Sequence, residues 1–420
     1  MSYARLSLST SETRGKRPWA LVVLAGLPLV GVLNCGGGGG GGYTSAPPPP
    51  PPPAPPFIRA ASLSGADEVP ATTSAARASG MVTVDPATLA IQGSLVSTDI
   101  QGTQAHIHEG ASGVSGSVVI PLTGGGGGVW TIPTGTVLTS AQFASLQAGN
   151  YYFNIHSASN PAGEIRGQIE LATRFTTLAG TNEVPANLST ATGVGVLAVN
   201  TNTGGAFGSI RTEGITGTAS HVHEGAAGVS GGVILPLSGD GAIWTLPSAS
   251  NLTLAQVATY QAGGLYGNVH SVAFPGGEIR GQFTLTSPVV RTTTLTGANE
   301  VPSNASAATG TGTIALDPKT LEFRVSVVTS GITGVAAHVH TGAVGIAGPV
   351  SIPLAQSADG SWVTPAGTYL TTAQFQALQS GGLYLNVHSV AYPGGEIRGQ
   401  IPADGGTTGG GGGGGTGGGY

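Results

Sequence analysis

Short segments in which apolar and polar residues alternate recur along most of the chain. Examples are G-M-V-T-V at 80–84, L-A-I-Q-G-S-L-V at 89–96 and G-T-I-A-L at 312–316, each bounded by glycine, proline, aspartate or asparagine. Such runs, rich in β-branched residues and flanked by turn residues, are typical of β-strands with one buried face. The pattern predicts an all-β fold of antiparallel strands. Two sheet faces must then pack on each other, so we expect a β-sandwich.

One segment of the pattern predicts a helix instead. In L-T-S-A-Q-F-A-S-L-Q-A-G at 138–149, Thr139 and Gln142 have the spacing of a capping box. Leu138 and Phe143 have that of a hydrophobic staple, and Gly149 follows as a helix stop. The equivalent cap, third-position and stop residues further along the chain are Thr253, Gln256 and Gly263, and Thr371, Gln374 and Gly381.

Four motifs recur three times in the same order. They are L-[SAT]-G-[AT]-[DN]-E-V-P, [AS]-H-[IV]-H-x-G, Y-x-N-[IV]-H-S and G-E-I-R-G-Q. Successive copies lie 114 to 118 residues apart, which is the length of a complete domain rather than of a solenoid repeat. We therefore expect three tandem domains, each with one short helix, joined by short linkers. Their expected limits are 57–172, 174–287 and 291–403.

This order of motifs resembles that of the CHRD domain, a family named after chordin. The resemblance covers nearly the whole of each repeat and rests on all four motifs. It implies an all-β extracellular module without established catalytic activity, known from a developmental signalling antagonist and from many bacterial proteins. The other parts of an animal chordin, notably its cysteine-rich modules, have no counterpart in this chain.

All nine histidines lie in two of these motifs, three in each repeat. Alternate side chains of a strand point to the same face, so the histidines of each H-x-H pair share a face while the residue between them points to the core. The Tyr, Asn and His of Y-x-N-[IV]-H-S share a face in the same way. The seven-residue loop after His156 predicts an antiparallel hairpin with the strand that follows Glu164. A neighbouring H-x-H strand would then complete a polar face with three imidazoles and a carboxylate.

Three imidazoles, with or without a carboxylate, form a workable ligand set for Zn²⁺ or Cu²⁺. The expected metal ligands are His106, His108 and His156, then His221, His223 and His270, then His338, His340 and His388. Additional candidate ligands are Glu164, Glu278 and Glu396, and the residues expected to orient a ligand or bound water are Asn154, Asn268 and Asn386. Neutral imidazole is the form that binds metal, so affinity should fall as the pH drops through about 6.5.

A structural role is the alternative for these polar residues. Histidines on a polar sheet face can simply be solvated or hydrogen-bonded. Ion pairing of Glu164 with its neighbour Arg166 is favoured over metal ligation for that carboxylate. The glutamates of the three E-V-P motifs are expected to tie a loop to a nearby arginine such as Arg166. They are Glu68, Glu183 and Glu300.

The N-terminal residues 1–35 predict export. Three basic residues precede an apolar stretch at 19–33, which has the length of a signal-peptide core. The only cysteine follows at once in V-L-N-C-G, which resembles the lipobox of bacterial lipoproteins, although Asn34 departs from the usual small residue. The resemblance implies lipidation of Cys35 and attachment to the cell envelope or cell surface. An ordinary cleaved signal and an uncleaved anchor are the alternatives.

The segments that flank the repeats have little to bury. Residues 36–56 begin with a glycine tract and continue as polyproline, so they predict a flexible piece followed by a stiff spacer. Residues 404–420 are nearly all glycine and threonine, which predicts disorder.

Composition and motifs together favour one class of function. Charged residues make up 8 % of the chain, the net charge is -5, and no run of Lys or Arg follows residue 17, so a nucleic-acid partner is not expected. The leading interpretation is a tethered, non-enzymatic binding or adhesion protein whose three modules engage an unidentified extracellular protein or polymer.

Two other interpretations stay open. One is a metalloenzyme, because H-V-H-E-G resembles the copper-ligand strand of copper-zinc superoxide dismutase. The bridging histidine and aspartate of that enzyme cannot be placed here, and one cysteine cannot form its disulfide. The other is a purely structural extracellular spacer.

Overall fold

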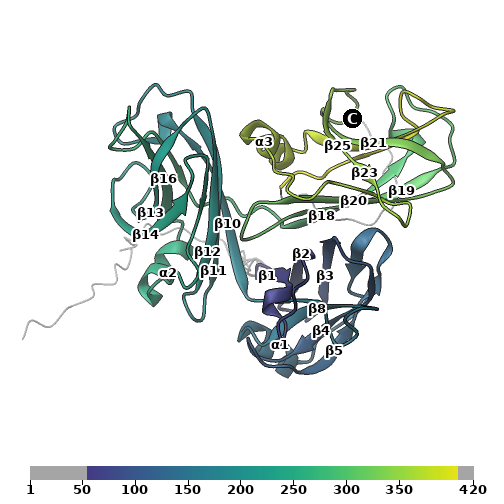
Figure 1. Cartoon of the computed structure of the whole chain (residues 1–420), viewed down its shortest axis with the longest axis horizontal. Helices are drawn as coiled ribbons and strands as arrows, with labels where there is room; N and C mark the ends of the chain where they lie inside the picture. Colours follow the sequence, from purple (N-terminus) through teal and green to yellow (C-terminus); the bar gives the residue numbers. More distant parts are fainter. Residues whose placement is uncertain (1–53, 405–420) are drawn as a thin grey trace, which may run out of the picture. The chain divides into compact units, whose positions relative to one another are not determined.

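The computed structural model describes residues 54–404. The expectations for the leader, for Cys35, for most of the Gly/Pro linker and for the C-terminal tail fall outside this range. The first domain contains the helix α1 (Ser140–Gln147) and nine strands (Figure 1). The strands are β1 (Phe57–Ser64), β2 (Arg77–Val84), β3 (Ile91–Thr98), β4 (Gly102–Glu109), β5 (Ser117–Pro121), β6 (Thr123–Gly124), β7 (Val129–Thr131), β8 (Tyr151–Ser157) and β9 (Ile165–Gln168).

The third repeat contains the same order of strands and helix, and in the second a single strand takes the place of β5 and β6. The second has β10 (Leu171–Ala179), β11 (Thr192–Asn200), β12 (Ala206–Glu213), β13 (Gly217–Glu224), β14 (Gly232–Gly239), β15 (Ile243–Thr245), α2 (Leu254–Gln261), β16 (Leu265–Ser271) and β17 (Ile279–Gln282). The third has β18 (Val290–Thr296), β19 (Thr309–Leu316), β20 (Phe323–Ser330), β21 (Gly334–Thr341), β22 (Val350–Pro353), β23 (Ala355–Gln356), β24 (Trp362–Val363), α3 (Thr372–Ser380), β25 (Leu383–Ser389) and β26 (Ile397–Gln400).

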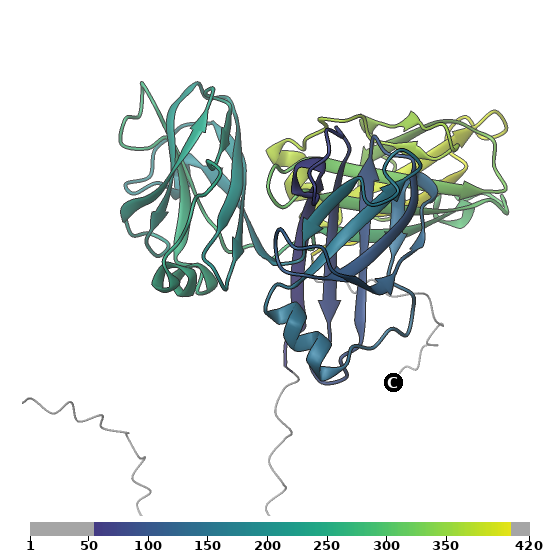
Figure 2. The ribbon, with the colours of Figure 1, turned by 60° about the horizontal axis from the view of Figure 1, so that its bottom comes forward.

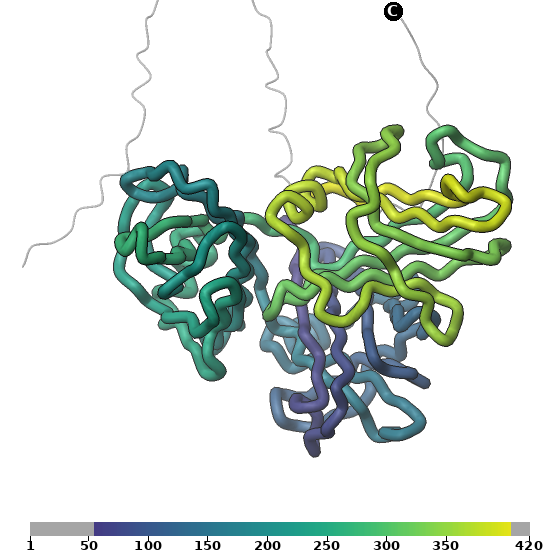
Figure 3. The backbone as a smooth tube through the Cα atoms, turned by 45° about the horizontal axis from the view of Figure 1, so that its top comes forward, coloured from purple at the N-terminus to yellow at the C-terminus, as the bar shows by residue number. Residues whose placement is uncertain are grey.

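Each domain is an antiparallel sandwich. In the third domain the strand order is β22-β21-β25-β26-β18-β19-β20-β24-β23, and β26 meets β18 at the single pair Arg398 and Thr296. The sheet therefore bends there into two layers, β22-β21-β25-β26 and β18-β19-β20-β24-β23. In the second domain β14 pairs with β13 and with β15, so one strand joins the two layers along their far edge. Figure 2 shows the first domain's strands side by side with α1 at one end. The tube of Figure 3 shows the strand runs of the third domain (green to yellow) connected by loops at their ends.

The core of each domain lies between these two layers. In the first domain Ile107 of β4 and Phe153 and Ile155 of β8 have no exposed surface, as the alternation predicted. Leu95 and Trp130 of the facing layer belong to the same cluster. Gly80 on β2 makes room for Phe153, since a Cβ there would lie 2.8 Å from its ring. The all-β sandwich expected from the sequence is confirmed.

The helices begin and end where the sequence indicated. Thr139, Thr253 and Thr371 each form a capping box with the glutamine three residues on. Each helix is followed by a glycine in the left-handed region, with φ of 81° at Gly149, 77° at Gly263 and 73° at Gly381. The helices have eight or nine residues. Among residues 54–404, no helix has the length and apolar character required to cross a membrane.

Candidate metal centre

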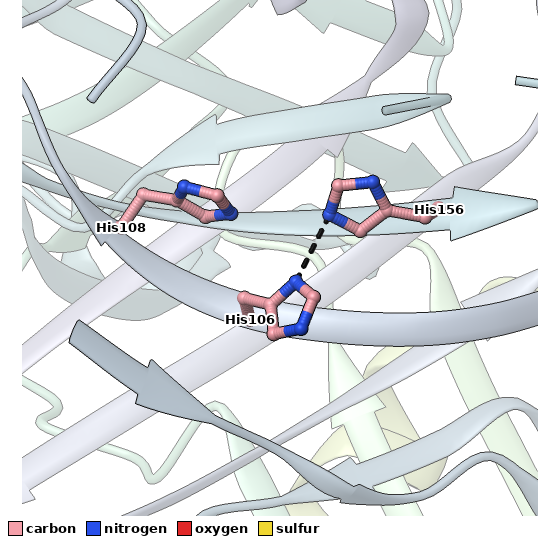
Figure 4. Close-up of side chains that lie close together, drawn as sticks. All are labelled: His106, His108 and His156. Carbon is pink, nitrogen blue, oxygen red and sulfur yellow. Dashed lines mark hydrogen bonds between the residues drawn. The ribbon is translucent and has the colours of Figure 1, made fainter. Parts of the chain in front are cut away.

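Two neighbouring strands bring the three histidines of each domain together. β4 and β8 are antiparallel, with His106 opposite Asn154, His108 opposite Tyr152 and His156 opposite Gln104. Directly opposed residues of an antiparallel pair share a face. The three imidazoles therefore project from the face that lies away from the core, and Figure 4 shows them converging. The predicted hairpin between the His156 strand and the strand after Glu164 is formed by β8 and β9.

The imidazoles are close enough to share one ion. His106 Nδ1 lies 3.0 Å from His156 Nε2 (Figure 4), and the equivalent distances in the second and third domains are both 3.1 Å. In each domain one ligand nitrogen from each of the three histidines lies within 4.8 Å of the other two. The structure thus brings together all nine histidines in the three groups expected from the sequence.

Backbone carbonyl groups determine which ring nitrogens carry hydrogen. His108 Nδ1 lies 3.0 Å from Gly116 O, and His156 Nδ1 lies 3.1 Å from Pro161 O. A carbonyl oxygen only accepts hydrogen bonds, so both Nδ1 atoms are the donors and the lone pairs of the neutral rings lie on Nε2. The other two domains repeat both contacts at 3.0 to 3.1 Å.

One ring nitrogen in each domain is buried without a partner. Within residues 54–404, Nε2 of His108, His223 and His340 has no hydrogen bond although it is shielded from solvent. A buried polar atom without a partner costs about 1–3 kcal/mol. The same atom is left without a partner in all three domains, so it is a repeated feature of the fold that requires an explanation.

Burial favours the neutral form of the H-x-H imidazoles by lowering their pKa. Burial lowers the pKa of His106, and the neighbouring His156 and His108 lower it further. Burial also lowers the pKa of His108, more than the Gly116 carbonyl raises it. In the other domains the pKa of the H-x-H histidines is lowered for the same reasons. If these histidines bind a metal ion, the lowered pKa would displace the loss of affinity, expected from the sequence near pH 6.5, to lower pH.

A tyrosine and an arginine support His108. Tyr152 stacks on His108 with ring centroids 5.0 Å apart, and the guanidinium of Arg166 lies over the Tyr152 ring, 3.4 Å from its centroid. The amide of Gly116 donates to Tyr152 Oη at 3.0 Å, so one glycine holds both the tyrosine and His108. A Cβ on Gly116 would lie 1.5 Å from Glu109 O, so only glycine fits there.

These supporting positions were not identified from the sequence. The signal was available, because a glycine follows each H-x-H pair eight residues after its second histidine and a proline follows the third histidine by five. The residues are Gly116, Gly231 and Gly348, and Pro161, Pro275 and Pro393. Their backbone carbonyls, rather than their side chains, are the functional atoms, which is why residue type alone did not point to them.

The glutamates that follow the hairpin loops make other contacts. Glu164 accepts from the hydroxyl groups of Ser74 and Ser157, and among residues 54–404 it forms no ion pair with Arg166. The predicted ion pair is therefore wrong, because Arg166 instead stacks on Tyr152 and donates to Ala111 O. Glu278 accepts from the hydroxyl group of Ser189, and Glu396 accepts from that of Ser306. None of the three belongs to a histidine group.

The glutamates of the E-V-P motifs connect a loop to the sheet, as expected, but their hydrogen-bond partner is an asparagine instead of an arginine. Asn268 Nδ2 donates to Glu183 Oε1 at 2.7 Å, and Asn386 Nδ2 donates to Glu300 Oε1 at 2.8 Å. Asn154 contacts Glu68 in the same way. The structural role is as expected while the partner is not. Burial raises the pKa of Glu300 to about 7 even though Arg398 and Asn386 lower it.

Comparison with known families agrees with the repeat pattern. The family model described as the CHRD domain matches residues 59–169, 175–283 and 291–401. No curated protein and no solved structure matches the chain. The three matched segments contain the three histidine groups and most of the described chain. The chain therefore belongs to the CHRD domain family and contains three tandem copies of the domain.

Proposed function

We propose that each domain binds one divalent transition-metal ion through its three histidines, in a non-enzymatic binding protein that acts outside the cell. The observation that carries this proposal is the buried, unpartnered Nε2 of His108, His223 and His340. Each of these atoms faces the group's other histidines with its lone pair available, because the opposite ring nitrogen donates to a backbone carbonyl.

The hydrogen bonds to backbone carbonyls leave Nε2 of His108 and Nε2 of His156 as ligand atoms in the first domain. The third is Nδ1 of His106, which donates to His156 Nε2 in this structure, so metal binding requires its hydrogen to move to Nε2 of His106. Tetrahedral zinc with bonds of about 2.0–2.1 Å requires nitrogen atoms about 3.3–3.4 Å apart. The observed 3.0 Å between His106 and His156 is close to this value, and the three ligand atoms lie within 4.8 Å of one another, so the rings have to move together when an ion binds. Three imidazoles suit Zn²⁺ and Cu²⁺.

Binding rather than catalysis is favoured by the surroundings of the histidines. Hydrolytic metal sites use an additional acid or base to move protons. Here Glu164 is held by two serines and Glu68 by Asn154, so neither carboxylate is directed at the metal position. A superoxide dismutase-like enzyme is the weaker alternative, since each described group contains three histidines and no aspartate.

Export and tethering complete the proposal and rest on the sequence alone. The apolar stretch at 19–33 and the cysteine that follows it support a lipid-anchored protein of the cell envelope or surface. Three domains behind a Gly/Pro-rich segment would present three metal sites to an extracellular protein or polymer.

Calorimetric titration of the full chain with Zn²⁺ and with Cu²⁺ tests metal binding. We expect three sites of micromolar affinity or tighter, and two sites when His221→Ala and His223→Ala are combined. Glu224→Gln is the matched control, because Glu224 follows His223 directly and bonds to Thr259 instead of the histidines. This control should retain three sites. No binding at micromolar metal, or three sites in the double histidine variant, would contradict the proposal.

A further inference from the structure

The fourth coordination position of each proposed site has no ligand from its own domain. The described groups contain three histidines and no carboxylate. In the second domain the nearest acidic residues in sequence are already engaged, Glu278 by Ser189 Oγ at 2.6 Å and Glu224 by Thr259 Oγ1 at 2.7 Å. Three neutral imidazoles also leave the two positive charges of the ion uncompensated. An anionic ligand from outside the domain would be attracted by that charge.

Apolar residues flank the histidines on the same face of the sheet. In the second domain Val233 lies opposite His223, Pro236 opposite His221 and Ala219 opposite His270. Cross-strand partners of this kind share a face and have Cβ atoms about 4.5–5.5 Å apart. Val233 is 52 % exposed, so it has apolar surface left to cover.

We call the three residues opposite the histidines the rim of the site. The third domain has the same residue types in its rim as the second, and the first domain differs at one position. Val350, Pro353 and Ala336 occupy the three positions in the third domain, and Val350 is also 52 % exposed. In the first domain Val118 and Pro121 are retained, but Gln104 replaces the alanine opposite the third histidine. The chain therefore offers two apolar rims and one with a polar residue.

We propose that the open position in the second and third domains takes an aliphatic carboxylate, whose oxygen binds the ion and whose alkyl chain covers the valine and proline of the rim. This inference rests on the proposed metal site. A carboxylate supplies the missing negative charge, and an alkyl chain of a few carbons reaches side chains that lie one cross-strand spacing from the ligand histidines. A purely polar anion would leave the exposed valine uncovered.

A carboxylate series tests this in the full chain loaded with Co²⁺, whose visible spectrum reports a change of ligand. Histidine-to-alanine substitutions in two domains at a time leave a single site for study. Acetate, butyrate and hexanoate are then titrated separately. Full burial of a methylene group corresponds to about fourfold in affinity. We expect hexanoate to bind at least about tenfold more tightly than acetate in the second and third domains, since part of the chain stays exposed.

The rim variants provide the controls. Val233→Ser should reduce the preference for hexanoate in the second domain to less than about threefold, without changing affinity for Co²⁺ or acetate. The first domain should show a smaller preference, and Gln104→Ala should increase it.

The possible failures can be distinguished. A chain that binds no Co²⁺ overturns the metal site and this inference together. A chain that binds Co²⁺ but gives no spectral change with any carboxylate, binds acetate and hexanoate equally, or keeps its full preference for hexanoate in Val233→Ser overturns this inference alone.

Discussion

A single glycine in each domain should control the metal site through its backbone. Gly231 O accepts from His223 Nδ1 at 3.0 Å, and Gly231 N–H donates to Tyr266 Oη at 3.0 Å. A Cβ at this position would lie 1.6 Å from Glu224 O and 2.6 Å from its carbonyl carbon. Gly231→Ala must therefore displace the loop from the strand that contains His223, and both hydrogen bonds are lost.

The size of the effect follows from these contacts. Two neutral hydrogen bonds contribute about 1–3 kcal/mol together. Loss of the group that orients a ligand histidine typically reduces metal affinity by about 10–100-fold. We therefore expect Gly231→Ala to weaken Zn²⁺ binding in the second domain by about 10–100-fold while the first and third sites keep their affinity.

Gly232→Ala is the matched control, because a Cβ at this neighbouring position would have no atom within 4 Å. Competition titration with a zinc chelator, in a chain whose first and third sites carry histidine-to-alanine substitutions, measures the effect. Circular dichroism would show whether the β fold is retained. Equal zinc affinity in Gly231→Ala and Gly232→Ala, with the fold intact, would refute the assignment of Gly231 as a positioning residue.

Four further predictions concern pH, stability and location. Because the pKa of the H-x-H histidines is lowered, zinc affinity measured by titration should change little between pH 7.5 and about 6.5 and fall below it; a steep loss already above pH 7 would contradict this. Because burial raises the pKa of Glu300 to about 7, the carboxyl contributes stability that is fully present below its unfolded pKa of about 4.5 and is lost as the pH rises through 7. Thermal unfolding should show the wild type losing about 1–2 kcal/mol relative to Glu300→Gln between pH 5 and pH 8, and parallel pH profiles would argue against a raised pKa. Thr253→Ala removes a capping box and should cost the second domain about 1 kcal/mol in chemical denaturation, whereas an unchanged midpoint would show that the cap is dispensable. Cys35→Ser should release the protein from the membrane fraction or block its processing, and unchanged retention and processing would exclude lipidation at this residue.

The sequence predicted those features that depend on local periodicity. Strand alternation placed Ile107 and Phe153 in the core and the histidines on the opposite face, because the side-chain period of a strand is fixed by its backbone. The helix limits followed from the capping threonines and terminal glycines, because these residues act on the backbone of the same short segment. The sequence predicted the β8–β9 hairpin from its short loop, whereas the pairing of β4 with β8, which completes each histidine group, joins strands far apart in the chain and was only assumed.

Other features depend on contacts that periodicity does not encode. Glu164 and Arg166 are two residues apart, which suggested an ion pair, yet the carboxylate reaches Ser74 from a distant segment and the guanidinium stacks on Tyr152. The partner of Glu68 was likewise decided by how the E-V-P loop lies over the sheet. The carbonyls of Gly116 and Pro161 could not be recognised because every residue has a carbonyl, and only the folded loops direct these two at histidines.

X-ray absorption at the zinc edge tests the metal site most directly. The full chain is loaded with Zn²⁺, freed of excess ion and measured without further modification. We expect about three zinc ions per chain, each with three imidazole nitrogens at about 2.0–2.1 Å and one further oxygen or nitrogen ligand. A first coordination shell of oxygen atoms without the outer-shell signal of imidazole would contradict it, because the zinc would then be bound away from the histidines.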